Sequence, residues 1–460
     1  MTFEPKNFSH AATLLEDVSR TLETSSASAA HLASELRVQS HILRDPSYTV
    51  VVAGLCSVGK SSFTGALWGD ATLLPAAVRD CTQTNTLLRT PRTDEASPQL
   101  ILHHLTRAHA AELTLRGLSY HRLNVLLTEV SGPLELIEPK YEHADAEGRL
   151  RLTIQHFNAL FQKRKDLFVL YEHLSDDLEL LKELLAFLDD PSFISGGMVK
   201  ADFAARREHL MGRRGPSGRP ENLGPLLALR RVELIAKARG WNCAPPRILD
   251  TPWIPAFHEA RRTELIREEA KKADALVLLS LPQLFEPEAW VLETLRERPS
   301  LARRTLVVFN QIDTVDTAAL FAPDGFCRAF ETNTTRLGKL GIPERNLFMS
   351  CARIPFLELT PDDADASERA TRLKKVMARI PRLLDGHPAS SFKERMVRAC
   401  TPDNWGLEDV RQRIEALGAQ EIPRQRAREA LQVMEECTQV PEVFASQWKE
   451  VRAELEDMGP

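Results

Sequence analysis

An apolar stretch runs straight into a glycine-rich loop near residue 50, and this junction constrains the fold more than any other feature. Residues 48–53 hold a run of β-branched valines and predict a buried strand. Residues 54–61 read G-x-x-x-x-G-K-S, and residues 62–68 predict the start of a helix. A strand, a loop of this spacing and a helix form a phosphate-binding P-loop, because backbone N–H groups and the helix N-terminus attract phosphate.

Each polar side chain of this loop has an expected partner on a bound nucleotide. Lys60 would reach the β- and γ-phosphates, and the Ser61 hydroxyl would bind Mg²⁺. The alternative is a glycine turn that only joins a core strand to a helix. The nucleotide-binding residues predicted in this loop are Gly54, Ser57, Val58, Gly59, Lys60, Ser61 and Ser62.

A base-recognition pattern lies far downstream. The apolar strand predicted at 305–309 leads into Asn-Gln-Ile-Asp, which matches N-K-x-D with Gln311 in place of lysine. Asp313 can accept hydrogen bonds from N1–H and the 2-amino group of guanine. Adenine offers neither donor, and a buried carboxylate left unpaired loses roughly 1–3 kcal/mol per hydrogen bond. Asn310 would tie this loop to the P-loop, and the Gln311 stem would pack on the base; the alternative is a polar turn.

A third predicted strand ends in an acidic residue at Asp250, within the sequence Arg-Ile-Leu-Asp-Thr-Pro-Trp. Such an aspartate holds Mg²⁺ through water. Nucleotide switches of this type read D-x-x-G, and Trp253 stands where the glycine belongs. Tryptophan keeps the backbone N–H but restricts φ and adds bulk near the γ-phosphate. We therefore expect binding to persist and basal hydrolysis to be slow.

The switch threonine that closes over Mg²⁺ is expected between these motifs. Thr82 occupies the expected place, Thr84 is the rival, and a solvated turn threonine is the alternative.

Two more apolar strands complete the pattern. Residues 347–352 predict a strand and a turn in which Ser350 and Cys351 touch the guanine edge. Residues 275–280 supply the strand expected between the acidic loop and the base loop. Several motifs in this order, each after an apolar strand, predict a guanine-nucleotide site.

These motifs resemble those of the dynamin superfamily. The P-loop sequence Gly-Leu-Cys-Ser-Val-Gly-Lys-Ser-Ser carries that superfamily's serine before the second glycine and its paired serines after the lysine. Leu-Leu-Pro at 73–75 followed by Cys-Thr at 81–82 is similar to bacterial dynamin-like proteins and mitofusins, as is the Ala-Asp strand at 273–279. The resemblance covers residues 47–89 and 228–352.

The resemblance implies a GTPase that hydrolyses GTP with Mg²⁺. It implies that Ser57 stabilises transition-state charge through a monovalent cation or the bridging oxygen, and that the Thr82 backbone orders the attacking water. Lys60 completes the predicted catalytic set, and Ser61, Thr82 and Asp250 form the predicted metal site. The resemblance also implies self-association and peripheral contact with a membrane.

The predicted fold class is α/β, a P-loop GTPase domain with a mostly parallel sheet flanked by helices. Two further parts are expected: a helical insertion, and a helical bundle built from both ends of the chain. The predicted boundaries are 1–46 for the N-terminal bundle helices, 47–420 for the GTPase domain with its insertion at 133–226, and 421–460 for the C-terminal bundle helices.

Composition favours an ordinary soluble, cytoplasmic protein, and the resemblance implies one of bacterial type. The chain has 460 residues, and its net charge of −5 argues against nucleic acid as a partner. Seven cysteines without paired spacing indicate reduced thiols. The N-terminus lacks the pattern of a signal peptide, and no apolar stretch approaches the ~20 residues of a membrane span.

Leucines at steps of three and four predict an amphipathic helix over 167–188 that ends near residue 190. Its apolar stripe would pack on the GTPase core or form a self-association surface. Residues 206–220 predict a flexible basic loop, which would be solvated, touch anionic lipid, or supply an arginine to a neighbouring nucleotide site.

Other segments carry secondary-structure signals only. An extended pair is predicted for 98–104 and 112–118, and a strand for 231–238. The adjacent His103 and His104 would face opposite sides of a strand, which argues against a metal site there. Helices are predicted within 7–44 and at 406–417, 423–437 and 443–455.

Two other functions remain open at this point. One is a guanine-nucleotide-binding scaffold with little turnover, which Trp253 favours. The other is a soluble GTPase switch that acts through protein partners rather than on a membrane.

Overall fold

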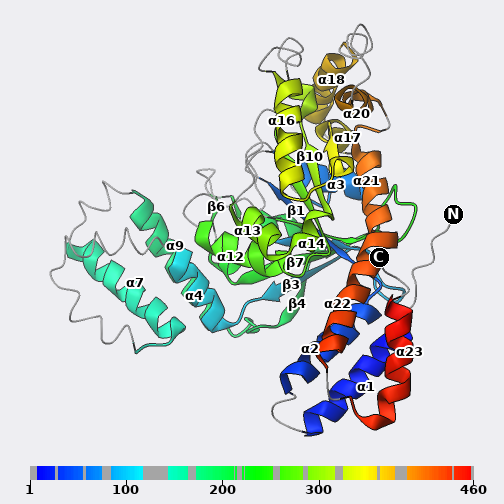
Figure 1. Cartoon of the computed structure of the whole chain (residues 1–460). Helices are drawn as coiled ribbons and strands as arrows, with labels where there is room; N and C mark the ends of the chain where they lie inside the picture. The colour runs from blue at the N-terminus through cyan, green and yellow to red at the C-terminus, as the bar shows by residue number, and fades with distance from the viewer. Residues whose placement is uncertain are drawn as a thin grey trace.

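The chain forms a central sheet wrapped by helices, a group of helices at one side of it, and a separate helical bundle (Figure 1). The computed structural model describes residues 8–25, 30–54, 58–74, 84–117, 143–163, 172–211, 213–214, 220–221, 223–251, 259–282, 289–315, 325–359, 363–378, 391–402, 404–437 and 440–456.

The central sheet has nine strands in the order β11-β10-β9-β1-β8-β2-β7-β3-β4. The strands from β11 to β8 all run parallel. Beyond them β2 is antiparallel to β8 and parallel to β7, while β3 is antiparallel to both β7 and β4. The strands are β1 Thr49–Gly54, β2 Thr86–Arg89, β3 Gln99–His104, β4 Met198–Ala201, β7 Leu229–Ile235, β8 Arg247–Asp250, β9 Ala275–Ser280, β10 Thr305–Phe309 and β11 Leu347–Met349.

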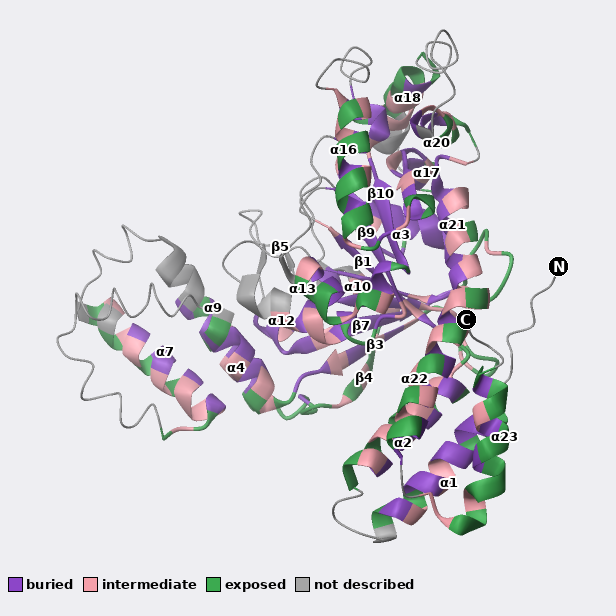
Figure 2. Ribbon diagram, viewed as in Figure 1, coloured by how far each residue is buried: buried purple, intermediate pink, exposed green. Residues whose placement is uncertain are grey.

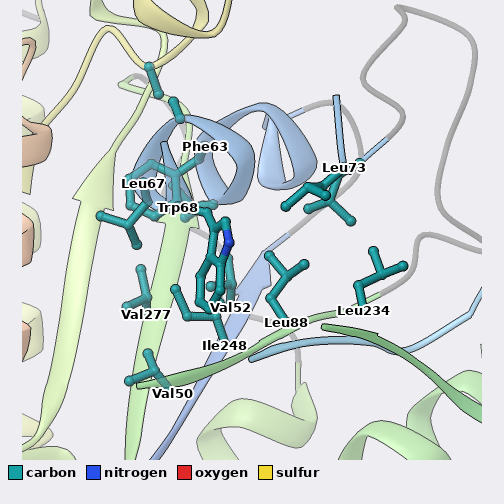
Figure 3. Packing of buried hydrophobic residues seen from close by; sticks show 14 of the residues in the cluster. Val50, Val52, Phe63, Leu67, Trp68, Leu73, Leu88, Leu234, Ile248 and Val277 are labelled. Carbon is teal, nitrogen blue, oxygen red and sulfur yellow. The ribbon is translucent and has the colours of Figure 1, made fainter. Parts of the chain in front are cut away.

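The parallel strands are mainly apolar and buried, and helices cover both faces of the sheet (Figure 2). Figure 3 shows one face, where Phe63, Leu67 and Trp68 of helix α3 (Lys60–Trp68) pack near Val52 and Ile248. Helices α17 (Arg353–Glu358) and α21 (Leu407–Ala416) complete this face. The other face carries α12 Glu259–Ala270, α13 Ala289–Glu297, α14 Pro299–Ala302, α16 Phe326–Lys339, α18 Asp363–Met377 and α20 Ser391–Cys400.

The predicted extended pair is half wrong. Residues 99–104 do form strand β3, but residues 112–117 belong to helix α4 (Arg107–Gly117). Strand β3 pairs with β7 and β4 instead. Alanine and leucine side chains of α4 are buried against α7 (Ala146–Lys163) and α9 (Glu172–Asp189), and this packing overrides the local preference for an extended chain.

The insertion is mainly helical, and α9 ends at Asp189 as its leucine stripe predicts. The stripe packs within a cluster shared with α4, α7 and α11 (Leu223–Leu227). Residues 164–171, which hold the start of the predicted helix, lie outside the described residues. The prediction missed β4, which falls inside the insertion and joins the edge of the main sheet.

The predicted flexible basic loop is partly wrong. Residues Arg206–Met211 form helix α10, which follows the short turn η3 (Phe203–Ala205). The Arg206 guanidinium donates to the Thr72 carbonyl at 2.8 Å and stacks on the Phe203 ring. Two short strands, β5 (Arg213–Arg214) and β6 (Pro220–Glu221), pair with each other. Residues 215–219 lie outside the described residues.

Both ends of the chain meet in the helical bundle (Figure 1). Side chains from helices of both ends share one core there. Its helices are α1 (Ser9–Ser25), α2 (Ala30–Arg44), α22 (Ile422–Glu436) and α23 (Ala445–Glu456), with the turn η8 (Glu442–Phe444) before the last. The predicted fold class, an α/β domain with a helical insertion and a bundle, is confirmed.

A buried arginine ties the bundle to the sheet. Arg426 of α22 donates to the carbonyls of Ile42, Asp45 and Ser47, which lead into β1, and forms an ion pair with Asp274. Asp274 also accepts the Thr49 N–H at 2.9 Å. The start of β1 is therefore fixed to the bundle.

The connection from α21 to α22 is a π-helical turn, η7 (Leu417–Glu421). The Tyr48 ring lies against Gly418, and the Tyr48 hydroxyl donates to the Ile414 carbonyl at 3.1 Å. Among the described residues, none of the helices combines the length and the apolar character needed to span a membrane.

Candidate functional site

The predicted site motifs lie at one edge of the sheet. Parallel strands share a direction, so the loops after β1, β8, β9, β10 and β11 emerge together. The register places Val52 beside Asp250, and Phe309 beside both Ser280 and Met349. Ligands of open α/β sheets bind at this edge.

The described part of the P-loop has the backbone that a close approach to phosphate requires. Gly59 precedes α3 with φ 83°, a left-handed conformation that disfavours side chains. A Cβ on Gly59 would lie 2.9 Å from the Asn310 amide nitrogen. Lys60 is buried, and its Nζ donates to the Gly54 carbonyl at 2.7 Å. The loop is therefore packed against the base loop, with its lysine curled over the strand end.

A hydroxyl and a carboxylate meet beside the P-loop. Ser61 Oγ donates to Asp250 Oδ2 at 2.8 Å, and Thr64 Oγ1 lies 3.4 Å from Oδ1 of the same carboxylate. Asp250 is fully buried, and the next residue, Thr251, fixes the strand end by donating its hydroxyl to the Val52 carbonyl at 2.9 Å. Hard oxygen donors of this kind suit Mg²⁺.

This pair fits a nucleotide-bound metal rather than an all-protein metal site. Within the part of the chain that the structure describes, His, Cys, Asp and Glu side chains nowhere gather in threes to hold an ion. Mg²⁺ in P-loop sites takes few protein ligands and relies on phosphate oxygens and water. Ser61 and Asp250 would be the protein's contribution.

Asn310 joins the P-loop to the base loop, as predicted from its position. Its side chain is buried, and its amide donates to the Val58 carbonyl at 2.9 Å. Its Oδ1 accepts the Ala352 N–H at the longer distance of 3.3 Å. Gln311 adopts φ 62°, which starts the short turn η5 (Ile312–Thr314). One side chain thus holds three loops of the site together.

The Asp313 side chain is buried, and only one of its two carboxylate oxygens has a hydrogen-bond partner. Its side chain has 0% exposure. Oδ2 pairs with the Arg372 guanidinium from α18, whereas Oδ1 has no hydrogen-bond partner. A cavity of about 280 Å³ adjoins the carboxylate, lined by Asp313, Thr314, Ser367, Glu368, Thr371, Arg372 and Lys375.

Arg372 was not found by sequence reasoning. Burial disfavours its charge, but attraction to Asp313 and a hydrogen bond to it outweigh burial and raise the pKa of Arg372. Arg372 Nε also donates to Glu368 at 2.7 Å, and Glu368 accepts from Arg353 of α17 at 3.0 Å. The only local signal is the i,i+4 spacing of Glu368 and Arg372 on one helix, which says nothing about Asp313.

Ser350 and Cys351 lie next to the base loop, but their side chains are engaged within the protein. Both are fully buried. The Ser350 hydroxyl donates to the Trp405 carbonyl at 3.1 Å, and the Cys351 N–H donates to the same carbonyl, also at 3.1 Å. Burial, with the Cys400 thiol beside it, raises the pKa of Cys351 well above its usual value. Any contact with a base would come from the backbone of this turn.

Three predicted residues lie outside the described residues: Ser57, Thr82 and Trp253. The rival switch threonine, Thr84, is buried, and its Oγ1 lies 3.5 Å from the His209 carbonyl. The choice between Thr82 and Thr84 stays open. Ser62 is buried in the first turn of α3.

No family model and no curated protein matches the chain. Among the solved structures that match it, two are described as an oligomerised bacterial dynamin pair for long-range sensing and tethering of membranes. They are 13% and 12% identical to this chain, with TM-scores of 0.41 and 0.40. Each match covers 97% of this chain, which spans 64% of the matched chain's length. At these TM-scores the likeness supports no conclusion about function. The proposed function rests on the geometry of the site.

Proposed function

We propose that the chain binds guanine nucleotide with Mg²⁺ and hydrolyses GTP in the manner of a dynamin-like GTPase. The observation that carries the guanine preference is the buried Asp313 carboxylate, whose Oδ1 lacks a partner beside a cavity. A buried acceptor without a donor costs about 1–3 kcal/mol. Guanine supplies N1–H and the 2-amino group at one edge, and adenine supplies neither.

The phosphate end of the proposal rests on Lys60, Ser61 and Asp250. Lys60 would exchange the Gly54 carbonyl, which now accepts from its Nζ, for phosphate oxygens. Ser61 and Asp250 would hold Mg²⁺, which when bound neutralises charge on the β- and γ-phosphates. Ser57 and the Thr82 backbone are proposed to stabilise charge and to order the attacking water. Catalysis of this kind is positioning and electrostatic stabilisation.

Nucleotide choice is tested by equilibrium binding of GDP, GTP, ATP and xanthosine diphosphate with Mg²⁺. GTP and GDP should bind and ATP should not. Asp313→Asn should shift preference toward the xanthine nucleotide, because the amide donates where the carboxylate accepted. Lys60→Ala should abolish binding while circular dichroism stays unchanged. Equal affinity for ATP and GTP would contradict the guanine assignment, and unchanged affinity in Lys60→Ala would make the loop structural.

Hydrolysis is tested by phosphate release at saturating GTP, measured against protein concentration. A rate per molecule that rises with concentration would support assembly-coupled turnover. A rate indistinguishable from the Lys60→Ala background would favour the low-turnover scaffold instead.

We also propose self-association and peripheral contact with a membrane. They rest on the sequence resemblance alone. Sedimentation with and without GTP, and co-sedimentation with anionic liposomes, test each separately. A chain that stays monomeric and in the supernatant under all conditions would favour a switch that acts through protein partners.

A further inference from the structure

The carboxylate proposed to read guanine is already paired with a cation. Asp313 Oδ2 accepts from Arg372, which lies 59 positions later in the chain on α18. The acceptor is fully buried, whereas 23% of the Arg372 side chain remains exposed. Arg372 also lines the cavity beside Asp313. The ion pair therefore borders the space that a base would enter.

Arg372 has a second acceptor within reach. Glu368 accepts from Arg372 Nε at 2.7 Å, and its side chain is 31% exposed. Glu368 is itself anchored, since Arg353 donates to it at 3.0 Å. Hydrogen bonding to Arg353, opposed by burial, and attraction to both arginines lower the pKa of Glu368, so it stays ionised. A guanidinium has five N–H donors in a fixed fork, so Arg372 can hold Glu368 while it leaves Asp313.

Guanine and Arg372 compete for the same atoms. The edge of guanine presents N1–H and the 2-amino group side by side, and two adjacent donors require both carboxylate oxygens. Only Oδ1 is unpartnered. Conditional on the guanine site proposed above, we propose that Arg372 is a base-site latch, which guanine displaces from Asp313 onto Glu368.

The latch adds to base selection. Guanine replaces the donors that it removes, so Asp313 remains paired throughout the exchange. A base without two adjacent donors cannot replace the lost ion pair. Leaving a buried carboxylate without its charged partner costs free energy. Arg372 would then stay on Asp313 and line the cavity. Specificity arises from an element that excludes the wrong base as well as from one that binds the right base.

The test is stopped-flow binding of GDP carrying a fluorophore on its ribose. Arg372→Gln removes the charge and most of the pairing with Asp313. A latch acts before the base is seated, so the association rate should rise by at least about 5-fold, with the dissociation rate changed less than about 2-fold. Lys374→Gln is the matched control, because Lys374 is an exposed cation on the same helix; it should change neither rate.

Glu368→Gln should change the association rate in the opposite direction. The test therefore does not depend on Arg372→Gln alone, should that variant misfold. Without its carboxylate, Arg372 has less to move onto, so the association rate should fall. An unchanged association rate in Arg372→Gln, a change confined to dissociation, or changes of the same sign in both variants would overturn the latch. If wild type and every variant fail to bind GDP while remaining folded, the proposed guanine site fails and the latch falls with it. Binding by wild type with no effect of Arg372→Gln removes the latch alone.

Discussion

Replacing Asn310 with alanine tests whether the phosphate and base halves of the site are one unit. The side chain is buried at 1% exposure and sits at the carboxyl end of β10. It holds the Val58 carbonyl at 2.9 Å and the Ala352 N–H at 3.3 Å. Alanine removes both hydrogen bonds and leaves two backbone groups unsatisfied inside the protein.

The expected size follows from these two contacts. Each orphaned buried group costs about 1–3 kcal/mol, and the longer contact lies toward the lower end. Asn310→Ala should therefore lose about 2–4 kcal/mol of unfolding free energy. Because the same bonds join the P-loop to the base loop, GDP affinity should fall at least ~10-fold, which equals about 1.4 kcal/mol.

Asn346→Ala is the matched control. Asn346 is fully buried at the other end of the same strands, where it donates to the Arg303 and Thr305 carbonyls at 2.8 and 3.0 Å. It also accepts from Arg413 at 2.7 Å. Its loss should lower stability by as much, as measured by urea unfolding, but change GDP affinity less than about 2-fold. Equal affinity losses in both variants, or none in Asn310→Ala, would refute the coupling.

Two further predictions concern stability. Gly418→Ala should destabilise the fold by about 1–3 kcal/mol, because the added Cβ would lie 2.4 Å from the Tyr48 ring. Gly338→Ala, at a helical site with open space, should stabilise it by about 0.5–1 kcal/mol. Urea unfolding that ranks the two variants in the other order would contradict the packing at η7. Burial opposes ionisation of Glu233, but hydrogen bonds from His103 and Arg89 outweigh it and lower its pKa from 4.5 to about 2. The stability that this depressed pKa contributes is complete above pH 4.5 and lost toward pH 2, so unfolding free energies of Glu233→Gln should depend less steeply on pH across that window than those of wild type.

The strands and the P-loop were predictable because their signals are local. Residues 48–53 and 305–309 are mainly apolar and β-branched, and both lie in buried parallel strands with helices on each face. Asn310 was predicted to tie its loop to the P-loop, and the loops that follow the parallel strands do emerge at one edge of the sheet. Its amide does reach Val58.

The secondary-structure predictions failed where tertiary packing, rather than the local sequence, decides between helix and strand. Residues 112–117 read as extended, yet they are helical because α4 buries one side against α7 and α9. Strand β4 is short and half-exposed, with a burial pattern that alternates as an edge strand's does. A four-residue edge strand inside a helical region leaves too weak a periodic signal to detect.

The base site shows the same limit at the level of single atoms. Asp313 was predicted from four contiguous residues, and its burial beside an open cavity is what that pattern requires. Arg372 belongs to no motif, and only the placement of α18 against η5 brings its guanidinium to the carboxylate. A motif therefore predicts which groups a ligand contacts, whereas the residues that compete with the ligand for those groups follow from long-range packing. Nucleotide affinity among chains with the same N-x-x-D pattern should accordingly vary with the residues that face the aspartate. In this chain that residue is Arg372, which the pattern itself does not predict.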